Sequence, residues 1–437
     1  MQKQFRYLLF VSAFCVLIYL VLAWTKLDLV TQSRKLTKHI HFDTQMPHSM
    51  EQSKHHVNAV TSQYRKQSIK PSHTRMSHNW NQTTKHNDTR ISQSGTQSVN
   101  VTNIGNSRNT HFMNTEIVQA NAVAGSHKYL IYLCDSARSC GGWGDRQRGL
   151  VSAFILANIT DRRFGIIMMS PCNITKFYIP NEVNWVIPAH ELDGKSYTTI
   201  DDMDSRRRMR RRFAAKDFDF NSEFPQDVVY LRSNVEYIAG GMSLRNGFYS
   251  KKVPDWARKS VSNTFRIAWG MLMKPTDILQ KDVEDFLSVM NYNSRSQPLV
   301  CAHVRLGRSN TIKMDTEIRT PMSALPLLWI FLDPYIQDGS KLFLATDSYV
   351  VRDMVKDEFG DSVYMTGGSI MHVDKQASWP RACEAFKVAL LEQLILTKCD
   401  VLVTSKSMFS QRAAAIRGTT KDLFILNRHN VINMKLS

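Results

Sequence analysis

The sequence predicts an α/β globular region made of two Rossmann-like lobes that face a cleft, and two observations carry this prediction. From residue 128 onward, a strand, a glycine-containing loop, a helix and a second strand follow one another, which is the order of a βαβ unit. From Pro298 onward, short apolar strands alternate regularly with helical patterns. A transmembrane helix and a disordered stem are predicted to precede the two lobes.

The chain opens with an apolar run that is predicted to anchor it in a membrane. Tyr7–Trp24 holds 18 residues without a charge, which is just long enough to cross a bilayer as a helix. A cleaved signal peptide is the alternative, but no small-residue cleavage site is evident. Lys3 and Arg6 favour a cytosolic N-terminus. We therefore expect a cytoplasmic tail over 1–6, a signal anchor over 7–24 and all later residues on the far side.

A polar segment separates the apolar run from the lobes. Residues 25–126 are rich in Gln, Ser, Thr, His and Asn and show no apolar period, so they cannot bury enough surface to offset their conformational entropy. We expect a disordered, glycosylated stem. Five Asn-x-Thr glycosylation acceptor motifs occur in the chain. Asn81, Asn87 and Asn100 lie in this segment, and Asn158 and Asn173 lie beyond it.

The net charge of +18 would suggest a nucleic-acid partner in a cytosolic chain. Beyond a membrane anchor that partner is not expected. The excess of basic residues is then better explained by solubility, an anionic membrane surface, or an acidic donor or acceptor substrate.

The cysteines also favour an oxidising compartment. Cys15 lies in the apolar run, and the other six would lie on the far side, where they allow up to three disulfides in fifteen pairings: Cys134, Cys140, Cys172, Cys301, Cys383 and Cys399. Cys134 and Cys140 are close enough to close one tight loop, which is the best single prediction. No cysteine or histidine pair has the spacing of a metal site.

The first lobe is predicted over 127–290. Its strands are expected at Lys128–Cys134 and Arg163–Met169, with a helical period over Leu150–Asn158 between them. The loop Gly141–Arg146 (GGWGDR) would lie at the helix N-terminus, where backbone N–H groups and the helix dipole favour an anion. A tight structural turn is an equal interpretation.

The rest of this lobe has a weaker pattern, and its main feature is an arginine run. Ser205–Arg212 contains six arginines. A solvated helix face, a basic processing site and a patch for an anionic acceptor all remain open. Helical periods near Ala257–Met271 and Lys281–Met290 are expected to lead into the second lobe.

The second lobe is predicted over 291–437, where strands and helices alternate as in a parallel, doubly wound sheet. Strands are expected at Leu299–Val304, Lys341–Thr346, Ser362–Thr366, Val401–Thr404 and Leu423–Leu426. Helices are expected near Met322–Tyr335, Tyr349–Phe359, Ala382–Lys398 and Met408–Arg417.

Three of these strands end in polar groups, and the carboxyl ends of parallel strands meet at one edge of a sheet. The groups are His303 with Arg305, Thr346-Asp347-Ser348, and Thr404-Ser405-Lys406-Ser407. Aspartate and serine often cap helices, which is the alternative for each group alone. Three such ends with arginines among them are better explained as a cradle for a nucleotide diphosphate.

These motifs, in this order, resemble the α1,6-/protein-O-/nodulation-type group of GDP-fucose fucosyltransferases. The resemblance covers roughly residues 127–430 and rests on GGWGDRxRG, HVR, FLATDS, an acidic helix residue, and D-x-L-V-T-S-x-S-x-x-S-x-R. It implies a GT-B fold and an inverting, metal-independent transfer of fucose from GDP-fucose. The acceptor would be a glycan, with a protein as second choice, and the protein would be a single-pass type II Golgi membrane protein with a luminal catalytic domain.

The resemblance also implies roles for individual residues. Arg305 would hold the β-phosphate as the sugar leaves, and His303 would fix the nucleotide. Asp347 would contact the ribose or guanine, and Glu392 would contact the base. The diphosphate segment would comprise Ser407, Ser410 and Arg412, and the glycine loop would border the donor from the other lobe with Gly142, Gly144, Asp145 and Arg146.

The catalytic base is less well defined by the resemblance. Some relatives have a glutamate about ten residues after the histidine, where this chain has Lys313. Asp315 and Glu317 lie close behind and are the candidates. No cofactor or metal is expected, because no DxD carboxylate pair lies in a strand-end loop. The formal DxD within Asp201–Asp204 directly precedes the arginine run and is better explained as a salt-bridged surface segment.

Two other functions compete with a fucosyltransferase. A Golgi sulfotransferase would also use a basic cleft, but no glycine-rich, lysine-bearing phosphate loop follows the first strand of the first lobe. A catalytically inactive, membrane-tethered carbohydrate-binding protein would explain the altered loop from Arg305 to Glu317. The expected partners are GDP-fucose, a glycan acceptor and the Golgi membrane, with a homodimer left open.

Overall fold

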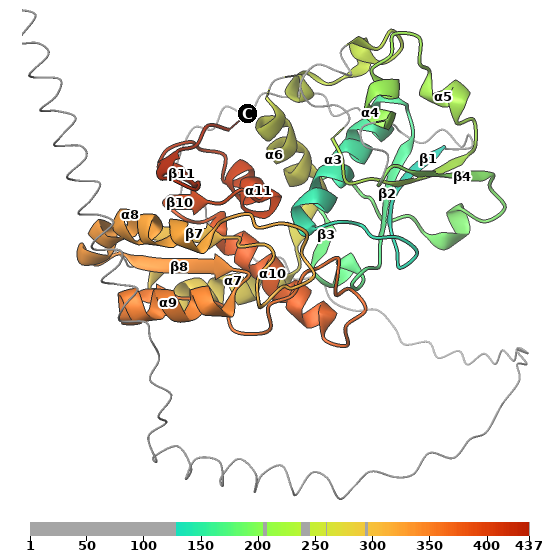
Figure 1. Cartoon of the computed structure of the whole chain (residues 1–437). Coiled ribbons are helices and arrows are strands. Elements are labelled where there is room, and N and C mark those ends of the chain that lie inside the picture. The colour runs from blue at the N-terminus through green and yellow to red at the C-terminus, as the bar shows by residue number, and fades with distance from the viewer. Residues whose placement is uncertain (1–127, 204–207, 237–244, 259, 293–295, 437) are drawn as a thin grey trace, which may run out of the picture. The chain divides into compact units, whose positions relative to one another are not determined.

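The computed structural model describes most of the chain beyond the predicted stem (Figure 1). The described residues are 128–203, 208–236, 245–258, 260–292 and 296–436. The predicted tail, anchor and stem over 1–126 lie outside them. Within the described ranges, no helix has both the length and the apolar character needed to cross a bilayer.

The first lobe contains a parallel sheet of four strands, as the βαβ prediction required. Its order is β2 (Arg163–Met168), β1 (Tyr129–Cys134), β5 (Val228–Arg232) and β4 (Tyr197–Asp201). The helix α3 (Trp143–Ile159) connects β1 to β2 and packs on both strands. The α/β class predicted for this lobe is confirmed.

Helix α3 begins at Trp143, well before the predicted start at Leu150. Its first two turns lack an apolar stripe, because glycines form part of the contact surface. A Cβ on Gly144 would lie 2.5 Å from the carbonyl carbon of Met408, and one on Gly149 would lie 1.9 Å from the carbonyl oxygen of Ser233. The helix is therefore buried through its backbone, which a search for apolar side chains does not detect.

The segment after β2 contains short elements that the sequence analysis left unassigned. They are β3 (Tyr178–Pro180), β4, α4 (Arg208–Phe213), α5 (Phe220–Glu223), β5 and β6 (Met273–Pro275), with β3 and β6 paired antiparallel. Single-turn 3-10 helices occur at Ile174–Lys176, Ala189–Glu191, Ser250–Lys252, Asp255–Ala257, Met322–Ala324 and Gly360–Ser362.

The arginine run and the formal DxD adjoin each other in this segment. Arg212 pairs with Glu223 and stacks over the ring of Phe218, as expected for a solvated helix face, while 204–207 lie outside the described residues. Asp201 pairs with Arg138 at 3.2 Å. Asp202 is fully buried, so the prediction of a surface segment is wrong at that position.

The second lobe contains a six-stranded sheet, and all five predicted strands are present. Its order is β12 (Val431–Asn433), β11 (Leu423–Leu426), β10 (Val401–Thr404), β7 (Leu299–Val304), β8 (Lys341–Thr346) and β9 (Val363–Tyr364). All neighbours are parallel except β11 and the unpredicted β12. The strands alternate with α8 (Leu325–Gln337), α9 (Tyr349–Phe359), α10 (Ala382–Leu396) and α11 (Met408–Arg417).

Two helices precede the predicted lobe boundary at 290/291, and they pack on different parts of the structure. α6 (Val261–Leu272) packs on α3 and α11. α7 (Asp277–Val289) packs on α10, and its residues Val283 and Leu287 share a core with Leu299 of the second sheet. The chain thus joins the second lobe before residue 290.

All six cysteines of the described lobes form disulfides. The predicted Cys134–Cys140 pair is confirmed, and Cys301–Cys399 lies within the second lobe. The third pair, Cys172–Cys383, connects the loop after β2 to α10. This bond and the contacts of α3 with α11 tie the two sheets together on one side.

Replacement of Gly144 by alanine tests the close approach of α3 and α11. The added Cβ would meet the Met408 backbone at 2.5 Å, so we expect a destabilisation of about 1–3 kcal/mol in thermal or urea unfolding. Gly270→Ala in α6 is the matched control, because nothing lies within 4 Å of its added Cβ. That variant should be stabilised by about 0.5–1 kcal/mol. Equal effects at the two positions would contradict the packing.

Candidate active site

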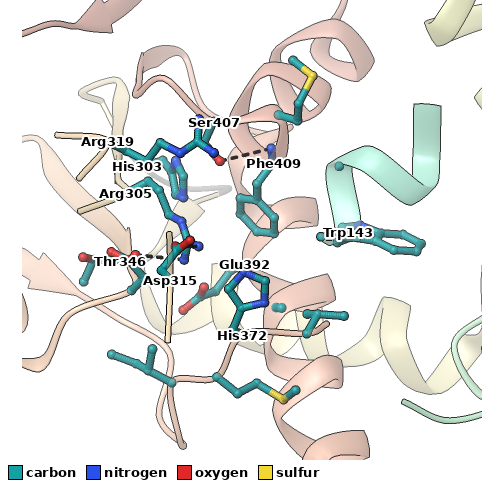
Figure 2. A pocket seen from close by; sticks show the side chains of 18 of the residues that line it. Trp143, His303, Arg305, Asp315, Arg319, Thr346, His372, Glu392, Ser407 and Phe409 are labelled. Atoms are coloured by element: carbon teal, nitrogen blue, oxygen red, sulfur yellow. Dashed lines mark hydrogen bonds and ion pairs between the residues drawn. The ribbon is translucent and has the colours of Figure 1, made fainter. Parts of the chain in front are cut away.

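A cavity of about 460 Å³ lies where the carboxyl ends of β7 and β8 meet the N-termini of α3 and α11. Its walls come from both lobes, and Figure 2 shows its side chains. The lining residues predicted from the sequence are Gly142, Gly144, Asp145, His303, Arg305, Asp315, Asp347, Glu392 and Ser407. The topology therefore brings most of the predicted site together.

Two helix N-termini border this cavity. Gly142 caps α3 with extended backbone and no capping side chain. Ser407 caps α11, and its hydroxyl accepts a hydrogen bond from the Phe409 N–H at 3.3 Å. Because Gly144 packs directly on the Met408 backbone, the two termini adjoin. Backbone N–H groups and two helix dipoles together give this wall a positive potential.

Arg305 extends from the end of β7 and is held between two carboxylates. Its guanidinium pairs with Asp315 and, at 2.8 Å, with Asp347. Asp347 also accepts hydrogen bonds from the N–H groups of Leu306 at 2.8 Å and Gly307 at 3.0 Å. Burial raises the pKa of Asp347, against the lowering effects of Arg305 and these N–H groups. Asp347 thus fixes the loop after β7 as well as the Arg305 side chain.

His303 is a buried, neutral histidine beside Arg305. Its Nδ1 lies 3.0 Å from the Ser405 hydroxyl and 2.9 Å from the Ser410 hydroxyl, and its ring packs 5.1 Å from that of Phe409. Burial, and secondly the charge of Arg305, lower the pKa of His303 to about 3. The imidazole therefore stays uncharged across the physiological range, and it can contribute hydrogen bonds to a ligand but no positive charge.

A second carboxylate and guanidinium line another part of the cavity. Glu392 accepts a hydrogen bond from the Thr366 hydroxyl, and its Oε1 lies 3.8 Å from the guanidinium of Arg352. Burial raises the pKa of Glu392 to about 7, although Thr366 and Arg352 both oppose the shift. Arg352 is anchored by a hydrogen bond to the Gly368 carbonyl oxygen at 3.2 Å. Figure 2 shows Glu392 apart from Ser407 and Arg319, with Arg305 between them in that view.

The loop between β9 and α10 forms a further wall that carries His372. The His372 Nδ1 accepts hydrogen bonds from the N–H groups of Asp374 at 3.3 Å and Lys375 at 3.2 Å. Asp374 in turn accepts hydrogen bonds from the Gly141 N–H at 3.0 Å and the Ser139 hydroxyl at 2.6 Å. This loop of the second lobe is thereby attached to the glycine loop of the first.

Four predicted site residues do not line the cavity. Arg146 is fully buried, and its Nε donates to the Gly141 carbonyl oxygen at 2.7 Å, which fixes the glycine loop. Ser410 lies behind His303. Arg412 stacks at 4.4 Å over Phe265. Glu317 is largely exposed and pairs with Arg319. Their placement favours supporting roles over direct contact with a ligand.

Several lining residues escaped the sequence analysis, among them Trp143, Arg319, Arg352, His372 and Lys406. Arg319 lies in the loop that follows Arg305, and the antiparallel bridge between Gly307 and Ile318 returns it to the cavity. Lys406 belongs to the TSKS segment that the sequence analysis singled out, but it received no role there. Among the residues that the structure describes, no group of three or more His, Cys, Asp or Glu side chains could hold a metal ion.

Comparisons with known proteins give similar structures only. No family model and no curated protein matches the chain. A mutant of FUT1 from Arabidopsis thaliana in complex with GDP has 15% identity over 70% of this chain and 72% of that chain, with a TM-score of 0.49.

Two further solved structures show a similar level of likeness. The NodZ alpha-1,6-fucosyltransferase soaked with GDP-fucose has 15% identity over 71% of this chain and 100% of that chain, with a TM-score of 0.45. POFUT1 in complex with GDP has 12% identity over 69% of this chain and 99% of that chain, with a TM-score of 0.38.

The environment of Glu392 predicts a pH-dependent stability difference. The pKa of the Glu392 carboxyl rises from its ordinary value of 4.5 to about 7 in the folded state, so the folded chain binds the proton more tightly. The contribution of Glu392 to stability is full below pH 4.5 and is lost as the pH rises towards 7. Glu392→Gln should therefore gain stability relative to wild type between pH 5 and 8, by up to about 3 kcal/mol. Urea unfolding across this range checks the prediction, and a pH-independent difference would contradict it.

Proposed function

We propose that the chain is an inverting glycosyltransferase that moves fucose from GDP-fucose to a glycan acceptor without a metal ion. One observation carries the proposal: a single cavity combines the Glu392–Arg352 pair with two helix N-termini and further arginines. The first feature complements the edge of a guanine, and the second complements a diphosphate.

The Glu392–Arg352 pair supports guanine over other bases. Guanine presents two N–H donor groups, N1–H and N2–H, beside the acceptor O6. A carboxylate can accept from both donors while a guanidinium donates to O6. Adenine has an acceptor at N1, which would face one Glu392 carboxylate oxygen and leave that oxygen without a donor. A buried site built for specific donors rejects a base that lacks them by several kcal/mol.

The helix N-termini suit the second task of the cavity, which is to stabilise the leaving diphosphate. As the bond to the sugar breaks, negative charge grows on the β-phosphate. The helix dipoles at the N-termini of α3 and α11, with the arginines of the cavity, are preorganised to stabilise that charge. They supply what a divalent cation supplies in other transferases.

Inversion by direct displacement requires a proton acceptor on the acceptor side of the sugar. Of the two carboxylates predicted for this role, Glu317 is largely exposed, whereas Asp315 lines the cavity. Asp315 is held in place by its ion pair with Arg305 and by a hydrogen bond of 2.8 Å from the Thr316 N–H to its Oδ1. The proposal therefore assigns the base to Asp315.

We also propose that the protein is a single-pass type II Golgi membrane protein with the two lobes in the lumen. The apolar run Tyr7–Trp24 supports an anchor of suitable length. Three disulfides in the two lobes support an oxidising compartment.

Calorimetric titration of the full chain in detergent tests the donor assignment. GDP and GDP-fucose should bind equally well with and without EDTA, whereas ADP, UDP and the sulfotransferase donor PAPS should bind at least about 100-fold more weakly. A well-folded sample that binds none of them would contradict the transferase and favour the inactive carbohydrate-binding protein. Preference for PAPS would favour a sulfotransferase.

Paired substitutions test the base. Asp315→Asn should lower kcat for fucose transfer by about 100-fold or more, because the proton acceptor is lost. Glu317→Gln should leave kcat within about twofold, since this carboxylate faces solvent. The measurement is steady-state transfer to an identified glycan acceptor, and the reverse ranking would move the base to Glu317.

A further inference from the structure

The charge on Arg305 is already balanced within the chain. Its guanidinium lies between Asp315 and Asp347, whose side chains are 7% and 8% exposed. With both carboxylates ionised, one positive and two negative charges leave this trio at −1. Such a trio does not attract a diphosphate by itself, so a ligand of that class needs another cation in the same cavity.

Arg352 and Lys406 also line the cavity, and the loop that follows Arg305 supplies a further cation, Arg319, through a backbone hairpin. Gly307 and Ile318 form an antiparallel bridge, and the Arg319 N–H donates to the Leu306 carbonyl oxygen at 2.8 Å. Gly307 has a φ of +79°, and a Cβ there would lie 2.2 Å from the Glu317 carbonyl oxygen. The hairpin thus requires glycine at 307, and it returns Arg319 to the cavity.

The Arg319 side chain is available to a ligand. Its ion-pair partner in the structure is Glu317, and the two side chains are 38% and 57% exposed, so the pair contributes little and can be exchanged. Arg319 lines the cavity together with Ser407 at the start of α11, and Figure 2 shows both. Burial raises the pKa of Asp145 in the first turn of α3, and the charge of Arg319 opposes this shift, after the larger opposing effects of Arg148 and Arg412.

One buried polar group beside the cavity lacks a partner within the described residues. Thr346 lines the cavity, the residue is 6% exposed, and its buried Oγ1 has no hydrogen-bond partner among those residues. A buried hydroxyl without a partner is costly unless another molecule supplies one.

We propose that Arg319 binds the diphosphate of the donor, beside the positive N-terminal ends of α3 and α11. Arg305 then serves mainly to hold Asp315 and Asp347 in the cavity. This inference rests on the proposed function, since it names the cation for the same donor. It differs from the assignment that the HVR motif alone suggests, in which Arg305 is the principal phosphate ligand.

Titration of the full chain in detergent with GDP, inorganic pyrophosphate and guanosine tests this role. Arg319→Ala should weaken binding of GDP and pyrophosphate by about 10- to 100-fold, because one or two charge-assisted hydrogen bonds are lost. Guanosine binding should stay within twofold of wild type. Arg319→Lys should retain part of the affinity, because it keeps the charge but loses the planar fork.

Arg308→Ala is the matched control, because Arg308 is exposed in the same hairpin and does not line the cavity. It should bind all three ligands as wild type does. Wild-type affinity of Arg319→Ala for GDP and pyrophosphate would overturn the inference while leaving the proposed function intact. A folded wild-type chain that binds neither ligand would overturn both.

Discussion

The structure depends on one close contact, the packing of the first turn of α3 on the first turn of α11. Gly144 permits it, because any side chain there would overlap the Met408 backbone. The contact places two helix N-termini side by side and unites the α/β lobes around one cavity. Without it the positive wall would be split between two separate sheets, and each helix terminus alone would attract an anion only weakly.

Polar contacts under this junction keep its geometry fixed. The Trp143 indole N–H donates to Gln393 Oε1 at 2.6 Å, and the buried amides of Gln147 and Gln393 exchange hydrogen bonds of 2.9 Å. Cys172–Cys383 adds a covalent connection between the lobes, and Asp374 binds the glycine loop. A cavity supported in this way is largely preformed, so less of the binding energy is spent on closing the lobes.

Much of the fold follows from local sequence, and the remainder depends on contacts that are distant in sequence. The strands of the second lobe are short apolar runs with both faces buried, which is why β7 and β10 were predicted correctly. The early start of α3 was missed because glycines, and not apolar side chains, form its contact surface. Cys134–Cys140 could be predicted from its short loop, whereas Cys172–Cys383 spans 211 residues and could not.

The residues of the candidate site likewise fall into those that the sequence predicts and those that depend on the folded loops. Strand-end residues such as His303 and Asp347 were found because parallel strands bring their ends to one edge. Arg319 and His372 come from loops without periodicity, so their place in the cavity depends on the hairpin at Gly307 and the loop before α10. The structure also separates Asp315 from Glu317, a distinction that spacing alone could not make.

A crystal structure of the chain with GDP bound tests the central claim most directly. The guanine edge should lie within hydrogen-bond distance of Glu392 and Arg352, and the diphosphate should lie at the N-termini of α3 and α11 beside Arg319. A nucleotide with its base turned towards Ser407, or bound outside this cavity, would contradict the proposed donor site.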